Sequence, residues 1–268
     1  MPVLAVLVIL GALPWIIAAA PASPDDAAAM QSIANTTGAG ALGWGVKSAD
    51  PCDGSWVGVS FDDARRVASI RASRAGLAGW LYASDLSKLT FLTELDLGFN
   101  GLTEQTGGDL PLLPTPLQHL RTLDLRSNRF LGVPEGFFAA FPALETINLD
   151  DNPTVGPRFR PDDVLTCSGL QSFSANNISL SLFPDYLGSA AAFPALESLS
   201  LARNELHGAI PAGFGNDGNI VPRRQWSEFT PHRAHRPVHR RHEEPRGGPF
   251  ANTVSADVSA NPRIDKPC

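Results

Sequence analysis

The sequence has few cysteines, few charged residues and almost no long apolar runs, and each shortage excludes a class of protein. Only 3 of the 268 residues are cysteines, too few for a disulfide-rich scaffold. Charged residues make up 18% of the chain, where about a quarter is usual. Hydrophobic residues make up 43%, so the chain is not a disordered polyelectrolyte. The net charge of −6 argues against a nucleic acid as partner.

One apolar run stands at the N-terminus. Residues 3–20 carry no charge, and Ala18, Ala20 and Ala22 give the small-residue spacing that a signal peptidase accepts. We expect residues 1–22 to be a signal peptide cleaved after Ala22, which implies secretion. The alternative is an uncleaved membrane anchor, since a span needs about 20 residues. No other run approaches that length, so we expect no membrane span in the mature chain.

A repeat with a period of 24 to 28 residues begins at residue 67. Its alternating LxL positions predict a short strand with one apolar face, which a single repeat cannot bury. We therefore predict an α/β fold: a right-handed leucine-rich-repeat solenoid with a parallel sheet on its concave face, about six repeats over residues 65–221. The lines of the pattern LxxLxLxxNxL begin at Val67, Leu92, Leu120, Leu144, Leu170 and Leu196.

The asparagine of the pattern follows each strand. Its side-chain amide is expected to satisfy buried backbone groups of its own turn and of the adjacent turn. Ala75 and Ile178 stand at this position in two of the repeats, and we expect local weakness there. The predicted ladder consists of Asn100, Asn128, Asn152 and Asn204.

A helical cap is expected over residues 25–64, because a solenoid needs its open apolar end covered. Residues 25–34 predict a short helix with two acidic residues in its first turn. Trp44 and the stretch DPCDGSWVGV follow this helix. The helix and these residues together form the predicted cap.

Residues 42–215 resemble the ectodomain of plant receptor-like kinases of the TMK type. The likeness rests on DPCDGSWVGVSFDDARRVASI, FLTELDLGFNGLT, LRTLDLRSNRFLGVPEGFF, LETINLDDNP and FPDYLGSAAAFPALESLSLARNELHGAIP. Members of that family join two repeat blocks to a membrane span and a cytoplasmic kinase, and they act in cell-surface auxin and growth signalling. The resemblance implies a truncated ectodomain in the apoplast or at the cell surface. Its expected partners are a protein or peptide ligand and a co-receptor.

Three departures from the family pattern stand out. The family's cap has a second cysteine where this chain has Phe61, so we predict that Cys52 is unpaired. No further repeat line follows Pro211, and residues 222–248 hold seven Arg, three Glu, four His and four Pro. We expect a disordered tail over residues 222–268. The kinase signatures, a Gly-rich loop, H-R-D and D-F-G, do not occur, so a kinase is not expected.

Three interpretations of the tail stay open. Its histidines could form a metal cluster, or its arginines could bind an acidic polymer or a membrane surface. We favour a shifted reading frame or a mis-spliced gene, and the closing GPFANTVSADVSANPRIDKPC weakly resembles the end of the family's first repeat block. The histidines are His232, His235, His239 and His242.

The binding surface is expected on the concave face, where the non-leucine strand positions point. Phe99 lies among charged residues and is a candidate anchor for a partner. The alternative is a solvated sheet face with no ligand. The residues expected on this face are Arg71, Arg74, Glu94, Asp96, Phe99, Arg121, Asp124, Arg126, Asn148, Asp150, Asp151, Ser174, Ser200 and Arg203.

The sequence offers sugar attachment sites but no catalytic constellation. Asn35 and Asn177 each begin an N-glycosylation sequon. G-x-S-x-G, H-E-x-x-H and the P-loop do not occur, so we predict a non-catalytic binding module without cofactor or bound metal. Two alternatives remain: a defence protein resembling polygalacturonase inhibitors, and a non-functional truncated gene product.

Overall fold

The structure is a computed structural model that describes residues 21–105, 107–158, 161–181, 194–208, 220–222, 254–257, 259–261 and 263–264. Nearly all of the predicted signal peptide and all four tail histidines lie outside these ranges. Within them, no helix is both long enough and apolar enough to cross a membrane.

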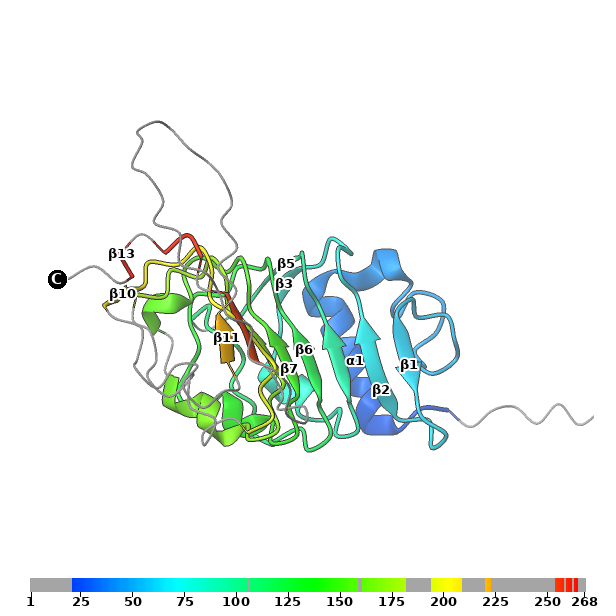
Figure 1. The fold of residues 1–268 in the computed structure, drawn as a ribbon. Helices are drawn as coiled ribbons and strands as arrows, with labels where there is room; N and C mark the ends of the chain where they lie inside the picture. The colour runs from blue at the N-terminus through cyan, green and yellow to red at the C-terminus, as the bar shows by residue number, and fades with distance from the viewer. Residues whose placement is uncertain are drawn as a thin grey trace, which may run out of the picture.

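Short strands stack side by side into one long sheet (Figure 1). In the described residues this sheet has nine strands in the order β1-β2-β4-β6-β7-β8-β9-β12-β11. Apart from the antiparallel pair of β1 and β2, the pairings are parallel, so the predicted parallel-sheet solenoid is confirmed. The predicted repeats supply β2 (Val67–Arg71), β4 (Glu94–Asp96), β6 (Thr122–Asp124), β7 (Thr146–Asn148), β8 (Ser172–Ser174) and β9 (Ser198–Ser200).

The strands are short because the buried apolar face of each is a single residue wide. The central residue of each three-residue strand is buried, and its two neighbours are half-buried. Adjacent strands pair in register, so these central residues stack into one apolar column through the solenoid. The column contains Leu95, Leu123, Ile147, Phe173 and Leu199.

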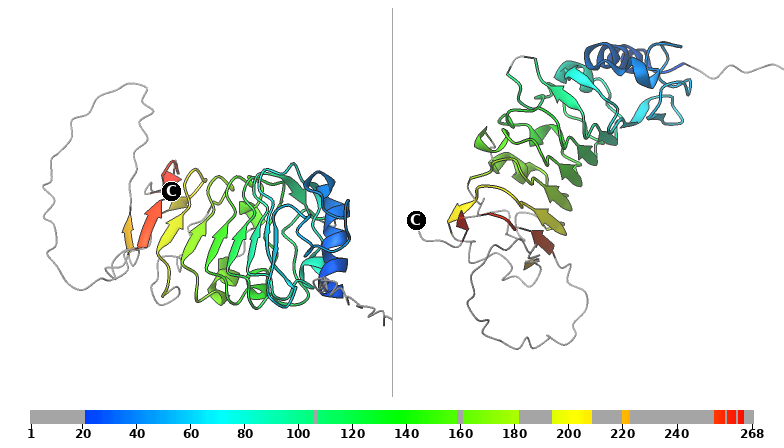
Figure 2. Two further views of the ribbon diagram at one scale, coloured as in Figure 1. Left: turned by 90° about the vertical axis from the view of Figure 1, so that its right-hand side faces the viewer. Right: turned by 90° about the horizontal axis from the view of Figure 1, so that it is seen from above.

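The cap closes the N-terminal end of the solenoid (Figures 1 and 2). Helix α1 (Pro24–Thr37) begins with a proline, which suits the first helical turn, and buries Met30 and Ile33. Trp44 and Trp56 are both buried and stack with ring centres 5.8 Å apart. A 3₁₀ helix, η1 (Ala39–Leu42), and strand β1 (Val59–Phe61) complete the cap.

Smaller elements fill the rest of each turn. Phe137 packs edge-on against Phe138 and Phe141, and all three side chains are buried. Two small sheets pair β3 (Ala78–Trp80) with β5 (Gly101–Thr103) and β10 (His207–Gly208) with β13 (Arg263–Ile264). The remaining helical segments are α2 (Ala83–Leu86), η2 (Phe138–Ala140), η3 (Gly156–Arg158) and η4 (Pro161–Thr166).

The asparagines of the repeat form a hydrogen-bonded ladder between turns. Asn128 Nδ2 donates to Leu97 O of the preceding turn at 2.9 Å and to Leu125 O of its own turn at 3.1 Å. Its Oδ1 accepts the backbone N–H of Leu102 at 3.0 Å. Asn100, Asn152 and Asn204 repeat this arrangement. At the two interrupted positions, the N–H groups of Ala75 and Ile178 are still accepted by the asparagine of the following turn.

The expectation of a disordered tail over residues 222–268 does not hold for residues 254–257, 259–261 and 263–264, which the structure describes. Strand β12 (Val254–Asp257) lies between β9 and β11 (Ile220–Pro222), as Figure 2 shows. The buried Asn261 continues the ladder: its Nδ2 donates to Leu201 O at 3.0 Å, and its Oδ1 accepts Leu206 N–H at 3.1 Å. These residues therefore add a turn to the solenoid.

Two features of the sequence hide this turn. The earlier ladder asparagines donate to a carbonyl 27 to 31 residues back, whereas Asn261 donates to one 60 residues back. In addition, Ala256 and Val258 stand where earlier lines have leucine, so the apolar pattern is weak.

Candidate binding face on the concave sheet

Three rows of side chains cross the ends of the strands. The strand row is the last residue of each strand and pairs in register with its neighbours. The turn row lies two residues further on, and the rim row is the residue just before each ladder position. The strand row is Arg71, Asp96, Asp124, Asn148, Ser174 and Ser200; the turn row is Ser73, Gly98, Arg126, Asp150, Asn176 and Ala202; the rim row is Arg74, Phe99, Ser127, Asp151, Asn177 and Arg203.

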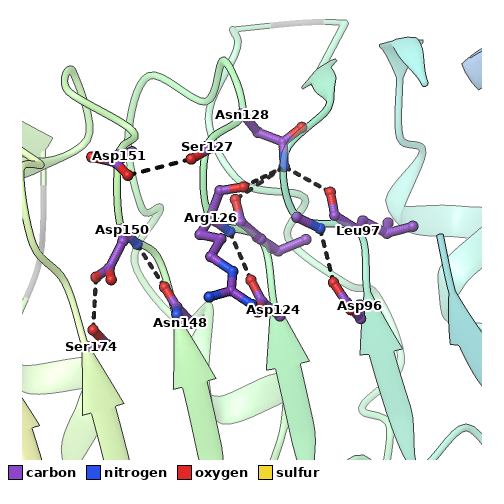
Figure 3. Close-up of polar contacts among 12 residues, drawn as sticks. Asp96, Leu97, Asp124, Arg126, Ser127, Asn128, Asn148, Asp150, Asp151 and Ser174 are labelled. Carbon is purple, nitrogen blue, oxygen red and sulfur yellow. Dashed lines mark hydrogen bonds and ion pairs between the residues drawn. The ribbon is translucent and has the colours of Figure 1, made fainter. Parts of the chain in front are cut away.

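Three strand-row side chains cap a backbone group of their own turn. Asp96 Oδ1 accepts the N–H of Gly98 at 3.1 Å, and Asp124 Oδ1 accepts that of Arg126 at 3.1 Å. Asn148 Oδ1 accepts the N–H of Asp150 at 3.0 Å (Figure 3). This is the Asx turn, in which a short polar side chain bonds the backbone two residues on. These predicted binding residues therefore hold the turns in shape.

Where the strand row has a serine, a side chain of the preceding turn caps the turn-row N–H in its place. The N–H of Asn176 is accepted by Asp150 Oδ1 at 2.7 Å, and Ser174 Oγ donates to the same oxygen at 2.8 Å. In the same way, Asn176 Oδ1 accepts the N–H of Ala202 at 2.6 Å and the hydroxyl of Ser200 at 2.8 Å. Each turn-row N–H named here is capped by an Asx side chain, from its own turn or from the one before. The signal in the sequence is an Asx at the turn row one repeat ahead of a strand-row serine.

Ion pairs occupy most of the predicted arginines. Arg71 Nη2 lies 2.6 Å from Glu94 Oε2, and this hydrogen bond holds the pKa of Glu94 below its usual value. Arg126 Nη2 lies 2.9 Å from Asp124 Oδ2. Arg121 pairs with Glu145, and each residue lies just before the strand of its own repeat. The face is mixed in charge, as the sequence indicates, but these charges are largely paired within the protein.

Asp124 lies at the acidic centre of the face, where neighbouring charges change its pKa. Burial raises the pKa of Asp124, and the charges of Asp96 and Asp150 raise it further. The backbone N–H and the guanidinium of Arg126 lower it. The charge of Asp124 is therefore offset in part by Arg126 before any partner binds.

Phe99, the candidate anchor, packs against two arginines. Its ring is half-buried, with the guanidinium carbon of Arg74 3.7 Å and that of Arg126 5.1 Å from the ring centre. Such cation–π contacts orient an arginine without neutralising it. Arg74 is exposed and has no ion pair within the part of the chain that the structure describes. We call Arg74, Phe99 and Arg126 the aromatic–arginine cluster.

Gly98 makes room for this cluster. A Cβ at position 98 would lie 3.1 Å from both Arg126 Cγ and Asp124 Oδ1, closer than ordinary contact. The arginine stem therefore lies directly against the glycine backbone. The sequence pattern gave no sign of this packing, because position 98 belongs to the variable positions of the repeat.

The other predicted site residues are spread over the chain. Asp151 accepts from Ser127 Oγ at 3.4 Å and from Asn177 Nδ2 at 2.9 Å, and Arg203 is exposed at the C-terminal part of the rim row. Asn35 is exposed near the end of α1, far along the chain from Asn177. In the described ranges, no group of three or more His, Cys, Asp or Glu could hold a metal ion.

Cys52 is a buried free thiol in the cap. Its Sγ lies 3.4 Å from Arg65 O, and burial raises its pKa to about 11. Phe61, where the resemblance implies a second cysteine, is 38% exposed, and the guanidinium carbon of Arg65 lies 4.4 Å from the centre of its ring. Cys167 is likewise buried and free, with its pKa raised to about 11 by burial.

The repeated turn geometry agrees with family matches along the chain. Residues 119–141 and 195–216 match the family described as Leucine Rich Repeat, and residues 88–104 match a second family of the same description. The chain contains leucine-rich repeats. Among curated relatives, Receptor-like kinase TMK2 of Arabidopsis thaliana is 33% identical over 195 residues, which is 72% of this chain and 21% of that protein. The leucine-rich-repeat chain thus spans about a fifth of the length of this relative.

Solved structures share the fold of this leucine-rich-repeat protein. A pollen receptor kinase 3 is similar with a TM-score of 0.55 and 22% identity, covering 82% of this chain and 88% of the other. A leucine-rich-repeat protein of Bacteroides eggerthii is similar with a TM-score of 0.50 and 14% identity, covering 74% of this chain and 53% of the other. Since the fold occurs in plant and bacterial proteins, it does not by itself determine what the chain binds.

Proposed function

We propose that this chain is a non-catalytic extracellular binding module whose concave face recognises a protein or peptide ligand, with a co-receptor as a further partner. The aromatic–arginine cluster is the observation that carries the proposal. The side chains of Asp96, Asp124 and Asn148 cap backbone groups, whereas among the described residues the Arg74 side chain and the Phe99 ring contact each other and cap no backbone group.

The cluster has the chemistry of an interface anchor. Aromatic and arginine side chains supply most of the binding free energy in protein interfaces. Here the ring orients Arg74 before any partner arrives, which lowers the entropic cost of binding. The solenoid beneath is hydrogen-bonded from turn to turn and provides a rigid support.

Two finer assignments rest on the sequence alone. The likeness to a receptor-like kinase supports a part in cell-surface growth signalling of the TMK type. The non-catalytic assignment rests on the lack of the catalytic motifs sought in the sequence. The proposal also places the chain outside the cell, as expected of a receptor's binding part.

A displayed-peptide selection tests the proposal. The secreted protein is immobilised, peptides are selected from a random library, and synthetic copies are titrated against wild type, Phe99→Ala, Arg74→Ala and Arg129→Ala. Arg129 is exposed beyond the ladder asparagine and serves as the matched control. We expect at least about a tenfold loss of affinity for the first two variants, as for interface hot spots, and none for the control.

Two results would contradict the proposal. One is a set of peptides that bind all four proteins equally. The other is inhibition of a polygalacturonase by the same preparation, without any peptide binding at the cluster, which would favour the defence-protein alternative.

A further inference from the structure

Asn177 occupies a position on the rim row where a modification would affect the binding face. It begins the sequon Asn177-Ile178-Ser179, and its side chain is exposed. Its backbone lies in the left-handed region, with φ of 51°, as do the other rim-row residues. The next residue, Ile178, is fully buried and donates its N–H to Asn204 Oδ1 at 3.0 Å. The buried neighbour fixes the backbone, so the exposed asparagine cannot turn inward.

The hydrogen bonding of Asn177 leaves room for an attached sugar. Asn177 Nδ2 donates to Asp151 Oδ1 at 2.9 Å. An amide nitrogen has two hydrogens, and an N-linked sugar replaces one of them. One amide hydrogen therefore stays on Nδ2 for a contact with Asp151.

The rim row places the first sugars beside particular neighbours. Asn177 N–H donates to Ala202 O at 3.0 Å, which brings Arg203 alongside on the next turn. Asp151 lies on the turn before. Arg74 lies four turns away, about 19 Å at the usual strand spacing. A glycan on Asn177 would therefore crowd the C-terminal part of the rim most strongly.

We propose that Asn177 carries an N-linked glycan that shields the C-terminal part of the rim row and confines a partner to the aromatic–arginine cluster. The confinement of a partner to this cluster rests on the proposed function, whereas the modification of Asn177 does not. The donor is an oligosaccharide on a lipid diphosphate. The Nδ2–C1 bond forms as the C1–O bond to the diphosphate breaks, the lipid diphosphate leaves, and the amide proton passes to a base of the transferase.

Site occupancy is the first test. The full chain is secreted from insect cells, and glycopeptides are mapped by mass spectrometry before and after peptide-N-glycosidase, which converts a glycosylated asparagine to aspartate. Ser179→Ala removes the sequon but keeps the Asn177 side chain, and Ser179→Thr keeps the sequon. We expect a glycan on Asn177 in wild type and Ser179→Thr and none in Ser179→Ala. An unmodified Asn177 in the secreted wild-type protein would overturn the proposal.

Shielding is the second test, and it needs no ligand. Phenylglyoxal labels exposed arginines, so its rate at Arg203 reports on the sugar and its rate at Arg74 is the internal control. We expect labelling of Arg203 to be several-fold slower in wild type than in Ser179→Ala, and labelling of Arg74 to be equal in both. Equal rates at Arg203 would overturn the shielding. If Asn177 is glycosylated and Arg203 is labelled more slowly, but no peptide binds at the cluster, the result contradicts the proposed function alone.

Discussion

Asp150 caps a turn that is not its own: its Oδ1 accepts the backbone N–H of Asn176, 26 residues further along the chain, at 2.7 Å. The same carboxylate accepts from Ser174 Oγ at 2.8 Å and from Asn176 Nδ2 at 3.0 Å. Three donors from the neighbouring turn thus converge on one side chain. Asp150, which the sequence places on the predicted binding face, therefore links two turns of the solenoid.

We predict that Asp150→Ala destabilises the solenoid. Its removal leaves the three donors without their acceptor, and the expected loss is about 1–3 kcal/mol of unfolding free energy. Asp150→Asn keeps an acceptor oxygen and should lose less. Urea denaturation of the purified protein measures both. Asp63→Ala, which removes an exposed carboxylate from the cap, is the control and should be nearly neutral.

A second substitution should rescue the first. Asn148, at the strand row one turn earlier, caps the N–H of Asp150 within its own turn. Ser174→Asn would place the same amide two residues before Asn176 and cap its N–H locally. In a double-mutant cycle we therefore expect Ser174→Asn to stabilise the Asp150→Ala protein more than wild type. Equal effects in the two backgrounds would rule out the exchange of caps.

These contacts show where sequence analysis reaches its limit. The LxL alternation predicted the strands, and the asparagine spacing predicted the ladder, because both follow from which side of the strand is buried. The same alternation placed Asp96, Asp124 and Asp150 on the concave face but did not predict their hydrogen-bond partners. Periodicity indicates the face on which a side chain lies, but not whether a backbone N–H or a ligand takes up its oxygen atoms. That depends on distances of a few ångströms between residues of different turns.

The buried Asp26 should make stability depend on pH. Its Oδ2 accepts the N–H of Val67 at 2.6 Å, and burial raises its pKa above 3.8, with further raising contributions from Asp25 and Asp62. A folded-state pKa above the unfolded value means that the protonated form is favoured by folding. This stabilising contribution is complete below pH 3.8 and is lost as the pH rises through the folded-state pKa.

Asp26→Asn isolates this contribution. Asparagine keeps an oxygen for the Val67 N–H but cannot ionise, so the variant should become more stable than wild type as the pH rises from 3.8 towards neutrality. Chemical denaturation at a series of pH values measures the difference between the two proteins. Taking the difference cancels groups that do not interact with Asp26, such as Glu94, whose lowered pKa acts in the opposite direction. A difference that is constant with pH, or that favours wild type at neutral pH, would contradict the prediction.

The two described thiols should be inert in the folded protein. Cys52 and Cys167 are buried, and burial raises the pKa of each to about 11. Because the thiolate is the reactive form, about one in a thousand of these groups is ionised at pH 8. We expect iodoacetamide to label neither residue in the native protein and both in urea, as read by peptide mapping. Rapid native labelling of Cys52 would show instead that the cap opens and exposes this thiol.

The added turn over residues 254–264 should be required for the stability of the turn before it. The N–H of Leu201 donates to Asp257 O at 2.7 Å, that of Arg203 to Ser259 O at 2.9 Å, and that of Leu206 to Asn261 Oδ1 at 3.1 Å. A chain ending at residue 253 removes all three acceptors and uncovers the buried Leu201 and Leu206.

Hydrogen exchange measures this directly, since an amide without its acceptor exchanges faster. We expect the amides of β9 and of residues 201–206 to lose protection in the shortened chain, while those of β4 and β6 keep it, because their partners lie on other turns. Asn261→Ala should give a smaller loss confined to Leu206 and its neighbours. If the shortened chain protects residues 201–206 as well as the full chain does, another segment must occupy the place of β12. Ile220–Pro222 would then be the first segment to examine, since it follows β9 at a distance closer to the normal repeat.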